Sequence, residues 1–248
     1  MFKLDEKRRE RPKRAENGSK PDRKGKGRRQ IPPQQVFDNL YYVGAGNVAS
    51  WAIDTGKSIV LVDALNNDEQ AQQYIIDGLS ALGLGNKPIS HLIISHGHGD
   101  HYGGFEVIKS TYSPRIVMSN VEWNYLENDK FASYRWGKKP SRDVAVADGE
   151  KLDVNGTELT LYVTPGHTPG HVVFFHPGDL IAMVGDVLFQ GSIGRTDFPK
   201  GDHPTLIASI REKLFPLGDD VDFIPGHGPM STFGHERESN PFVSDHRG

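Results

Sequence analysis

The sequence contains no cysteine among its 248 residues. A disulfide scaffold, a zinc site with cysteine ligands and a thiol nucleophile are therefore excluded. Long hydrophobic runs are also missing, because the longest apolar stretches, such as Ser58–Val62 and Val172–Phe175, are strand-sized and far short of the ~18 residues of a membrane-spanning helix. The N-terminus lacks the apolar segment of a secretory signal. We therefore expect a soluble, cytoplasmic protein with no membrane partner.

Positive charge is concentrated at the N-terminus. Residues 1–30 hold thirteen Lys and Arg against five Asp and Glu, a net charge of +8, and because the whole chain carries −3 the remaining residues carry −11. This segment has too few apolar residues to offset the entropy of ordering, so we predict a disordered basic tail over residues 1–35 and one folded domain over residues 36–248. We interpret the tail as a solvated extension and expect no nucleic-acid partner, since no aromatic residues interleave with its charges. A nucleic-acid-binding arm is the alternative.

From Leu40 onward, short apolar runs alternate with turns and amphipathic segments. The spacing of Ile75, Leu79 and Leu82 predicts a helix over Asp68–Leu82. The same criteria predict helices over Gly104–Thr111, Val121–Glu127 and His203–Leu214, and strands over Leu40–Val43, Val48–Ile53, Ser58–Val62, His91–Ser95, Arg115–Met118, Thr157–Val163, His171–Phe175, Leu180–Val184 and Val221–Ile224. The polar segment Asp129–Asp148 is interpreted as a flap. Each half has strands first and then a helix, which predicts an α+β fold, a four-layer αββα sandwich with helices outside two facing sheets.

Histidine and aspartate gather in loops that follow predicted strands. The segment Ser95-His96-Gly97-His98-Gly99-Asp100-His101 has three imidazoles and a carboxylate within six positions, and His167, Asp186 and His227 lie in later loops bracketed by Gly or Pro. Imidazole and carboxylate groups suit zinc, iron or manganese. Burying so many ionisable groups together without a cation would be prohibitively costly, so the pattern predicts a metal site.

These motifs carry a resemblance to a known family. The series His96-x-His98-x-Asp100-His101, then His167, Asp186 and His227, resembles the dinuclear metal signature of the metallo-β-lactamase superfamily over about residues 36–243. The resemblance implies the αββα fold and two divalent ions, zinc first, with iron or manganese as alternatives. It places His96, His98 and His167 on one ion, Asp100, His101 and His227 on the other, and Asp186 between them. Seven ligands also exceed what one tetrahedral zinc ion uses.

The histidines outside this series, and Asp63, are interpreted as supporting, structural or solvated residues. His171 is interpreted as a support of His167 or as packing at a strand start, and Asp63 as a support of the metal loop, with a turn cap as the alternative. We expect His91 and His176 to be structural. The polar surroundings of the others predict solvated side chains: His203, His235 and His246.

Two branches of the superfamily compete for the substrate. From His167 onward the chain resembles the short glyoxalase II-like hydrolases, in Pro165–Phe175, Gly191–Pro199, Phe223–Pro229 and Glu236–Phe242, and its Gly-Arg-Thr-Asp stretch is also similar to that of the single-iron persulfide dioxygenases. The earlier segments Leu40–Gly44, Asn47–Ala52 and Val62–Asn67, with the insertion Asp129–Asp148, are similar to the cysteine-free β-lactamases. Asp186 favours the first branch, since thioester-cleaving members keep this carboxylate where cysteine-free β-lactamases have a small hydroxyl residue.

The expected reaction is hydrolysis of a small molecule. A hydroxide shared by two metal ions suffices to attack a thioester, because a thiolate leaves without a proton donor, whereas a lactam nitrogen needs protonation or metal stabilisation. Asp100 is the candidate catalytic residue that orients the nucleophile. Arg195 and Asp197 either contact a substrate carboxylate or brace their own loop. A glyoxalase II-like thioesterase is the favoured hypothesis, and a β-lactamase or related amide or lactone hydrolase is the alternative. A metal-dependent nuclease or nucleic-acid-binding member of the superfamily is the third hypothesis, favoured only by the basic tail. Full-length glyoxalase II has a further glutathione-gripping helical domain after the last ligand, so glutathione specificity stays open.

Overall fold

The computed structural model describes residues 31–128 and 138–245. The expected basic tail up to residue 30, residues 129–137 of the expected flap and His246 lie outside the described residues. Gln34 and Gln35, assigned above to the tail, lie in the first strand instead, because they pair with Tyr42 and Tyr41 of the next strand. No described helix is long and apolar enough to cross a bilayer.

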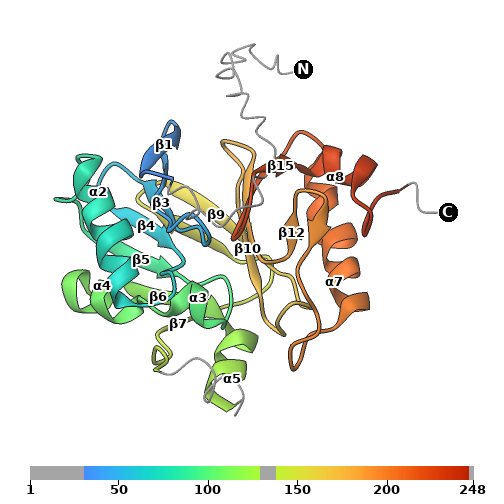
Figure 1. Cartoon of the computed structure of the whole chain (residues 1–248), viewed down its shortest axis with the longest axis horizontal. Coiled ribbons are helices and arrows are strands. Elements are labelled where there is room, and N and C mark those ends of the chain that lie inside the picture. Colours follow the sequence, from blue (N-terminus) through green and yellow to red (C-terminus); the bar gives the residue numbers. More distant parts are fainter. Residues whose placement is uncertain (1–30, 129–137, 246–248) are drawn as a thin grey trace, which may run out of the picture.

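Two sheets lie face to face with helices on both outer sides (Figure 1). Within the described residues, the first sheet has seven strands in sequence order, with antiparallel pairs up to β4 and parallel pairs from β4 to β7. Its strands are β1 (Gln34–Phe37), β2 (Leu40–Tyr42), β3 (Trp51–Asp54), β4 (Ile59–Val62), β5 (Ile89–Ile93), β6 (Arg115–Ser119) and β7 (Val144–Val146).

The second sheet has six strands among the described residues, in the order β15-β14-β11-β10-β9-β8, and only β11 and β14 run parallel. Its strands are β8 (Lys151–Val154), β9 (Thr157–Val163), β10 (Val172–His176), β11 (Ile181–Gly185), β14 (Asp222–Pro225) and β15 (Ser231–Thr232). A separate hairpin joins β12 (Leu188–Phe189) to β13 (Ser192–Ile193).

Helices form the outer layers. The first helical segment runs continuously through α1 (Asp68–Gln70), η1 (Ala71–Ile76) and α2 (Asp77–Ala81); the Asn67 side chain caps its start, and it ends just before Gly83, whose φ of 77° no longer fits a helix. The others are α3 (Gly99–Tyr102), α4 (Phe105–Tyr112), α5 (Asn120–Asn128), α7 (His203–Ser209) with η2 (Ile210–Leu214) and η3 (Phe215–Leu217), and α8 (Phe233–Ser239).

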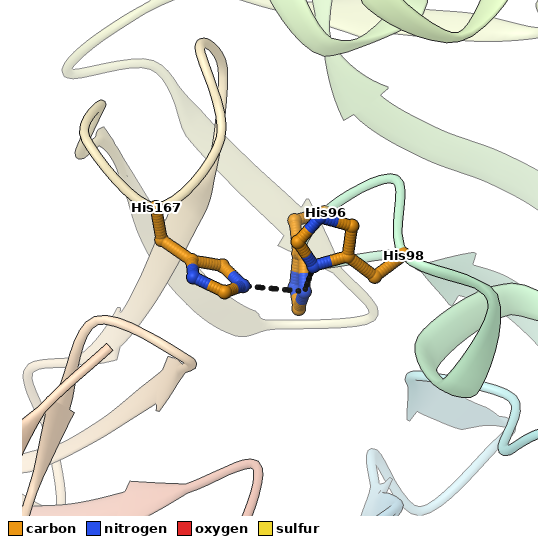
Figure 2. A group of neighbouring side chains, drawn as sticks. All are labelled: His96, His98 and His167. Atoms are coloured by element: carbon orange, nitrogen blue, oxygen red, sulfur yellow. Dashed lines mark hydrogen bonds between the residues drawn. The ribbon is translucent and has the colours of Figure 1, made fainter. Parts of the chain in front are cut away.

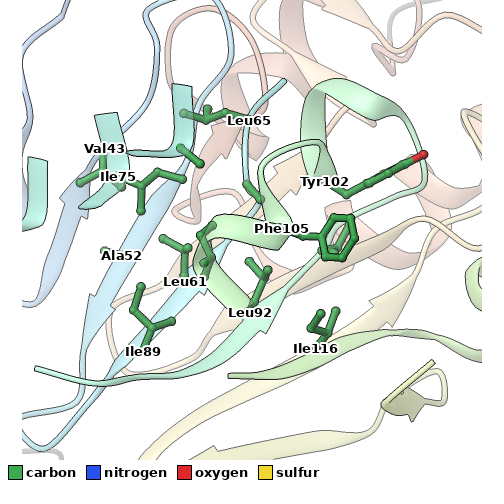
Figure 3. Close-up of a cluster of buried hydrophobic side chains, with 14 of the residues drawn as sticks. Val43, Ala52, Leu61, Leu65, Ile75, Ile89, Leu92, Tyr102, Phe105 and Ile116 are labelled. Atoms are coloured by element: carbon green, nitrogen blue, oxygen red, sulfur yellow. The ribbon is translucent and has the colours of Figure 1, made fainter. Parts of the chain in front are cut away.

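Alternate residues of single strands pack into different layers. In β4, Leu61 packs with Ile75 of the helical layer (Figure 3), and Ile59 belongs to the same core. Val60 and Val62 join the core between the sheets. In β10, the even-numbered residues of 172–175 face that same central core and the odd-numbered residues pack against α7. Because successive side chains of a strand point to opposite faces, sheets covered on both sides need strands that are apolar throughout. Three cores between four layers confirm the predicted α+β αββα sandwich.

Several short elements were not predicted from the sequence. The segment interpreted as a polar flap contains β7, which pairs with the edge of β6, so that part of the interpretation was wrong. Strands β8, β12, β13 and β15 and helix α8 were also missed. In α8 only Phe233 and Glu236 are buried, too few to produce a helical periodicity. Strand β7 depends on a partner that is distant in sequence, whereas β8, β12, β13 and β15 each pair with a strand close by in the chain and lack the apolar runs that predicted the other strands.

Candidate metal centre

The seven predicted ligands gather at one edge of the two sheets. Loops at the carboxyl ends of strands carry most of them: the His96–His101 segment follows β5, Asp186 follows β11 and His227 follows β14. His167 lies in the turn between β9 and β10. Parallel strands end at the same edge of a sheet, so β5 in one sheet and β11 and β14 in the other deliver their loops to a common place.

Three histidines form one group. His96 and His98 come from the first loop and His167 approaches from the opposite sheet (Figure 2). His96 Nε2 lies 3.1 Å from His98 Nδ1 and 3.2 Å from His167 Nε2. All three side chains are buried. The arrangement brings together residues more than 65 positions apart in the chain, as the separation of 71 positions between His96 and His167 shows.

Asp100, His101 and His227 form a second group beside the first. His227 Nε2 lies 3.4 Å from Asp100 Oδ2, and His101 Nε2 lies 3.8 Å from the same oxygen. Asp186 stands between the groups: its Oδ2 is 3.4 Å from His227 Nε2 and 3.7 Å from His167 Nε2, and its Oδ1 is 3.5 Å from His101 Nε2. Asp186 therefore contacts histidines of both groups.

The outward nitrogens of four histidines are held by fixed partners. His167 Nδ1 lies 2.7 Å from the Arg195 carbonyl, and His227 Nδ1 lies 2.5 Å from the Asn47 carbonyl. A carbonyl can only accept, so each Nδ1 carries the proton and each Nε2 faces the centre.

Asp63 orients the other two imidazoles. One of its oxygens lies 2.7 Å from His101 Nδ1 and also accepts the Ser95 hydroxyl proton at 2.9 Å. The Ser95 oxygen must then accept from His96 Nδ1, 3.0 Å away. Asp63 therefore supports the His96–His101 loop, which was one of the two interpretations of its role. Ser95 connects Asp63 to His96 by hydrogen bonds, and this role was not predicted from the sequence. Asp63 holds a φ of 62°, a left-handed conformation that aspartate tolerates better than most residues.

The ring tautomers show that the first group fits a cation. With both Nδ1 atoms protonated, neutral His96 and His167 point two lone pairs at each other across 3.2 Å. Two nitrogens bound to one tetrahedral zinc ion lie about 3.3 Å apart, given Zn–N bonds of about 2.0–2.1 Å. Elsewhere in the cluster, the buried His101 Nε2 and Asp186 Oδ1 have no hydrogen-bond partner among the described residues. The cluster can therefore hold divalent metal ions.

Charges divide the histidines into two kinds. Burial, with the neighbouring imidazoles His167 and His101, lowers the pKa of His98 to about 3. Burial opposes protonation of His227 as well, but the carboxylates of Asp100 and Asp186 outweigh it and raise its pKa to about 10. The pKa of His101 is raised for the same reason, against its burial. In the metal-free protein the first group is neutral and the second is a network of imidazolium and carboxylate charges.

Two glycines make room for this packing. A Cβ on Gly226 would lie 2.4 Å from Asp186 Oδ1 and 2.8 Å from His101 Cε1. Gly185 has a φ of 48°, and a Cβ there would lie 2.6 Å from His171 Nε2. A larger residue at position 226 would displace a member of the cluster, and one at position 185 would displace His171 behind it.

A pocket of about 720 Å³ opens over the cluster. Its walls outside the seven cluster residues combine apolar, small and basic side chains: Asn66, Gly99, Phe189, Ser192, Ile193, Arg195 and Phe198. Arg195 lies over the Phe198 ring at 4.0 Å and forms a two-pronged ion pair with Asp197, at 2.7 Å and 2.6 Å. Arg195 thus both braces its own loop and borders the pocket.

The other histidines lie outside the cluster or behind it. His171 is buried and stacks on His96, and its Nε2 accepts from the Asp186 backbone N–H at 3.1 Å, so it supports the ligand loops as expected. His176 contacts Asp179, and His203 and His235 are exposed.

The buried Glu122 was not predicted as a residue of this site. Burial raises the pKa of this carboxyl group to about 7, although three hydrogen bonds oppose the shift.

Comparison with known proteins agrees with this geometry. A family model described as the metallo-beta-lactamase superfamily matches residues 43–227. The hydroxyacylglutathione hydrolase GloC of Haemophilus influenzae is 44% identical over 160 residues, which cover 62% of this chain and 75% of GloC. The crystal structure of the BLEG-1 B3 metallo-beta-lactamase has a TM-score of 0.70 and 29% identity, covering 82% of this chain and 99% of that one. The structure of TTHA1623 in a di-iron-bound form has a TM-score of 0.66 and 26% identity, covering 86% and 100%.

Proposed function

Since the chain belongs to the metallo-β-lactamase superfamily, we propose that it is a dinuclear metal-dependent hydrolase with glyoxalase II-like activity on acyl thioesters such as S-lactoylglutathione. The similarity to the hydroxyacylglutathione hydrolase GloC supports this choice of substrate class. The proposed partner is a small molecule that enters the pocket above the cluster.

The position of Asp186 carries the proposal. This carboxylate contacts His167 of one group and His101 and His227 of the other, all within 3.7 Å. We assign His96, His98 and His167 to one ion, Asp100, His101 and His227 to the second, and Asp186 to both. When bound, a pair of divalent ions lowers the pKa of water toward neutrality and polarises a carbonyl group.

The chain's own residues would then position the reactants. Asp100 borders the pocket with 31% of its side chain exposed, so its carboxylate can accept a hydrogen bond from water and orient that water toward the substrate carbonyl. Phe189, Ile193 and Phe198 give the pocket apolar walls that exclude water from an acyl group. A thiolate leaving group requires no proton donor, which fits thioester cleavage at this site.

β-Lactam hydrolysis is the alternative, and the structural similarity to the BLEG-1 B3 metallo-beta-lactamase favours it. A lactam nitrogen leaves poorly and must be protonated or otherwise stabilised as its bond to carbon breaks. The two hypotheses therefore differ in what the site has to supply to the leaving group.

The test is turnover of a substrate panel by purified protein of measured metal content. We expect hydrolysis of S-lactoylglutathione that a chelator abolishes, with little hydrolysis of a chromogenic cephalosporin or an acyl-homoserine lactone. Asp186→Ser should lower thioester kcat/KM by about 100-fold or more, because it removes the carboxylate that both groups share. Asp220→Ser, at an exposed carboxylate, is the matched control and should match the wild type.

Elemental analysis of the same preparation separates two ions per chain from one or none. Fast cephalosporin turnover with an inert thioester would reverse the order of the two hypotheses. A single iron per active chain would refute the dinuclear assignment.

A further inference from the structure

Another buried carboxylate lies behind the seven candidate ligands and has no place in the chemistry above. Glu122, in α5, is 0% exposed. Its Oε1 accepts the Gly97 backbone N–H at 2.6 Å, and its Oε2 accepts the Gly170 N–H at 2.8 Å and the Thr168 hydroxyl at 3.0 Å. Each carboxylate oxygen therefore binds a different loop.

Both loops carry metal-ligand candidates. Gly97 separates His96 from His98, and Thr168 directly follows His167. The first loop leaves β5 of the seven-stranded sheet, whereas the second precedes β10 of the six-stranded sheet. One carboxylate thus joins the two sheets at the edge where the three histidines of the first group meet.

The surroundings of Glu122 show how closely α5 and the second loop approach each other. The Ser119 hydroxyl donates to the Gly170 carbonyl at 2.6 Å and accepts the Glu122 backbone N–H at 3.0 Å. A Cβ on Gly170 would lie 2.2 Å from the Glu122 nitrogen. Helix α5 and the loop are therefore locked in one register by Ser119, Glu122 and the absence of a side chain at residue 170.

Only a carboxylate satisfies this set of partners. All three are donors, and a carboxylate presents two oxygens and no proton, whereas a glutamine would turn an NH₂ group against one of the N–H donors. Removing a carboxylate from water is costly, and hydrogen bonds to its charged form offset part of that cost. The three hydrogen bonds of this buried carboxylate therefore fix the distance between the two loops.

We propose that Glu122 is a positioning residue that sets the distance between the His96–His98 loop and the His167 loop, and so determines the affinity of His96, His98 and His167 for a divalent cation. It acts through the backbone of both loops and touches neither the ion nor a substrate. The inference concerns metal binding by the chain and does not depend on which substrate is hydrolysed.

The test uses Glu122→Gln, which keeps the shape of the side chain but can accept hydrogen bonds with only one atom. Zn²⁺ affinity of the metal-free protein is measured by competition with a chromophoric chelator, and the geometry of the first site by the visible absorption of bound Co²⁺. We expect affinity for the first ion to fall ~10- to 100-fold and the Co²⁺ spectrum to change. Glu127→Gln, at an exposed carboxylate of the same helix that pairs with Arg142, should leave both unchanged.

The melting temperature of each metal-free variant separates positioning from simple bracing. Unchanged affinity and spectrum in Glu122→Gln, even with a lower melting temperature, would overturn the proposal, because the carboxylate would then stabilise the fold alone. If Glu122→Gln does not fold, Thr168→Val decides. It removes one of the three donors and should weaken Zn²⁺ binding severalfold, and wild-type affinity in that variant would likewise overturn the proposal.

Discussion

At the residue scale, the centre depends on which nitrogen of each histidine carries a proton. Carbonyls of Arg195 and Asn47 hold the Nδ1 protons of His167 and His227, while Asp63 holds that of His101. The orientation of each ring is fixed before any ion arrives. Such preorganisation lowers the entropic cost of metal binding, because the ligands do not have to be ordered by the ion.

The two groups should respond differently to pH. In the metal-free protein His227, whose pKa is raised to about 10, and His101, whose pKa is also raised, carry protons at pH 7, whereas His98, whose pKa is lowered to about 3, does not. A metal binds the imidazole lone pair, so a raised pKa means that protons compete with the ion below that pKa. We expect Zn²⁺ binding to the second group to release protons and to weaken as the pH falls from 8 to 6, with the first group nearly unaffected.

Isothermal titration calorimetry in buffers of different ionisation enthalpy counts these protons. The first ion should bind with almost no proton release and the second with release of about one proton for each protonated imidazole that binds it. His227→Gln should reduce the release at the second step by about one. Equal proton release at both steps would contradict the division of the histidines into a neutral and a charged group.

At the scale of elements, α8 supports one wall of the pocket without reaching it. Glu236 is fully buried and accepts the Gly191 N–H at 2.8 Å, the Ser231 hydroxyl at 2.5 Å and the Asn240 amide at 2.8 Å. Asn240 in turn donates to the Ser192 carbonyl at 3.0 Å. Gly191 and Ser192 belong to the β12–β13 hairpin, which lines the pocket. The Glu236–Phe242 motif therefore has a structural role.

Replacing Glu236 should loosen that wall. Glu236→Ala leaves three donors without their acceptor, which we expect to lower the free energy of unfolding by roughly 2–4 kcal/mol. The substrate KM should rise more than kcat falls, because the hairpin shapes the pocket and holds none of the seven cluster residues. Thermal denaturation and steady-state kinetics measure the two effects. Glu238→Ala, at an exposed position of α8, is the control, and an equal effect in both variants would refute this role.

Strands that consist of an apolar run were predictable from the sequence, and short strands that depend on a pairing partner were not. The run Ile59–Val62 is apolar at every position and buried throughout, so its strand follows from hydrophobicity alone. Strand β7 has only three residues, and it exists because Val117 and Ser119 of β6 offer it a pairing edge. Short strands gain most of their stability from a neighbour that the local sequence does not reveal.

At the scale of the whole molecule, charge is separated between the N-terminal segment and the body. The first thirty residues carry a net charge of +8 in a chain whose total is −3. Basic segments attract phosphate, which was the reason for considering a nucleic-acid partner. The described part of the chain places the seven cluster residues and the pocket between residues 47 and 227.

Removal of residues 1–30 should therefore leave the activity intact. We expect the truncated protein to keep its metal content and to hydrolyse the thioester with kcat/KM within about twofold of the full chain, because the described contacts of the cluster lie within the body. Elemental analysis and steady-state kinetics check this. Fluorescence anisotropy with a labelled DNA duplex, at low and moderate salt, should detect no binding by either protein. Salt-dependent binding that the truncation abolishes would restore the nucleic-acid hypothesis.

The sequence by itself determined the chemistry of the ligands and the layered fold. Imidazole, carboxylate and the absence of thiols are properties of residue types, and the alternation of apolar runs with turns is a local pattern. Only the tertiary structure decided which nitrogens face the centre, that Asp63 and Ser95 orient two of the rings, and that Glu122 joins two loops. The physical reason is that these contacts are non-local: Glu122 reaches Gly170 across 48 positions of sequence, and His227 reaches the Asn47 carbonyl across 180. Such contacts form only when both sheets pack, and no local pattern of residues specifies them.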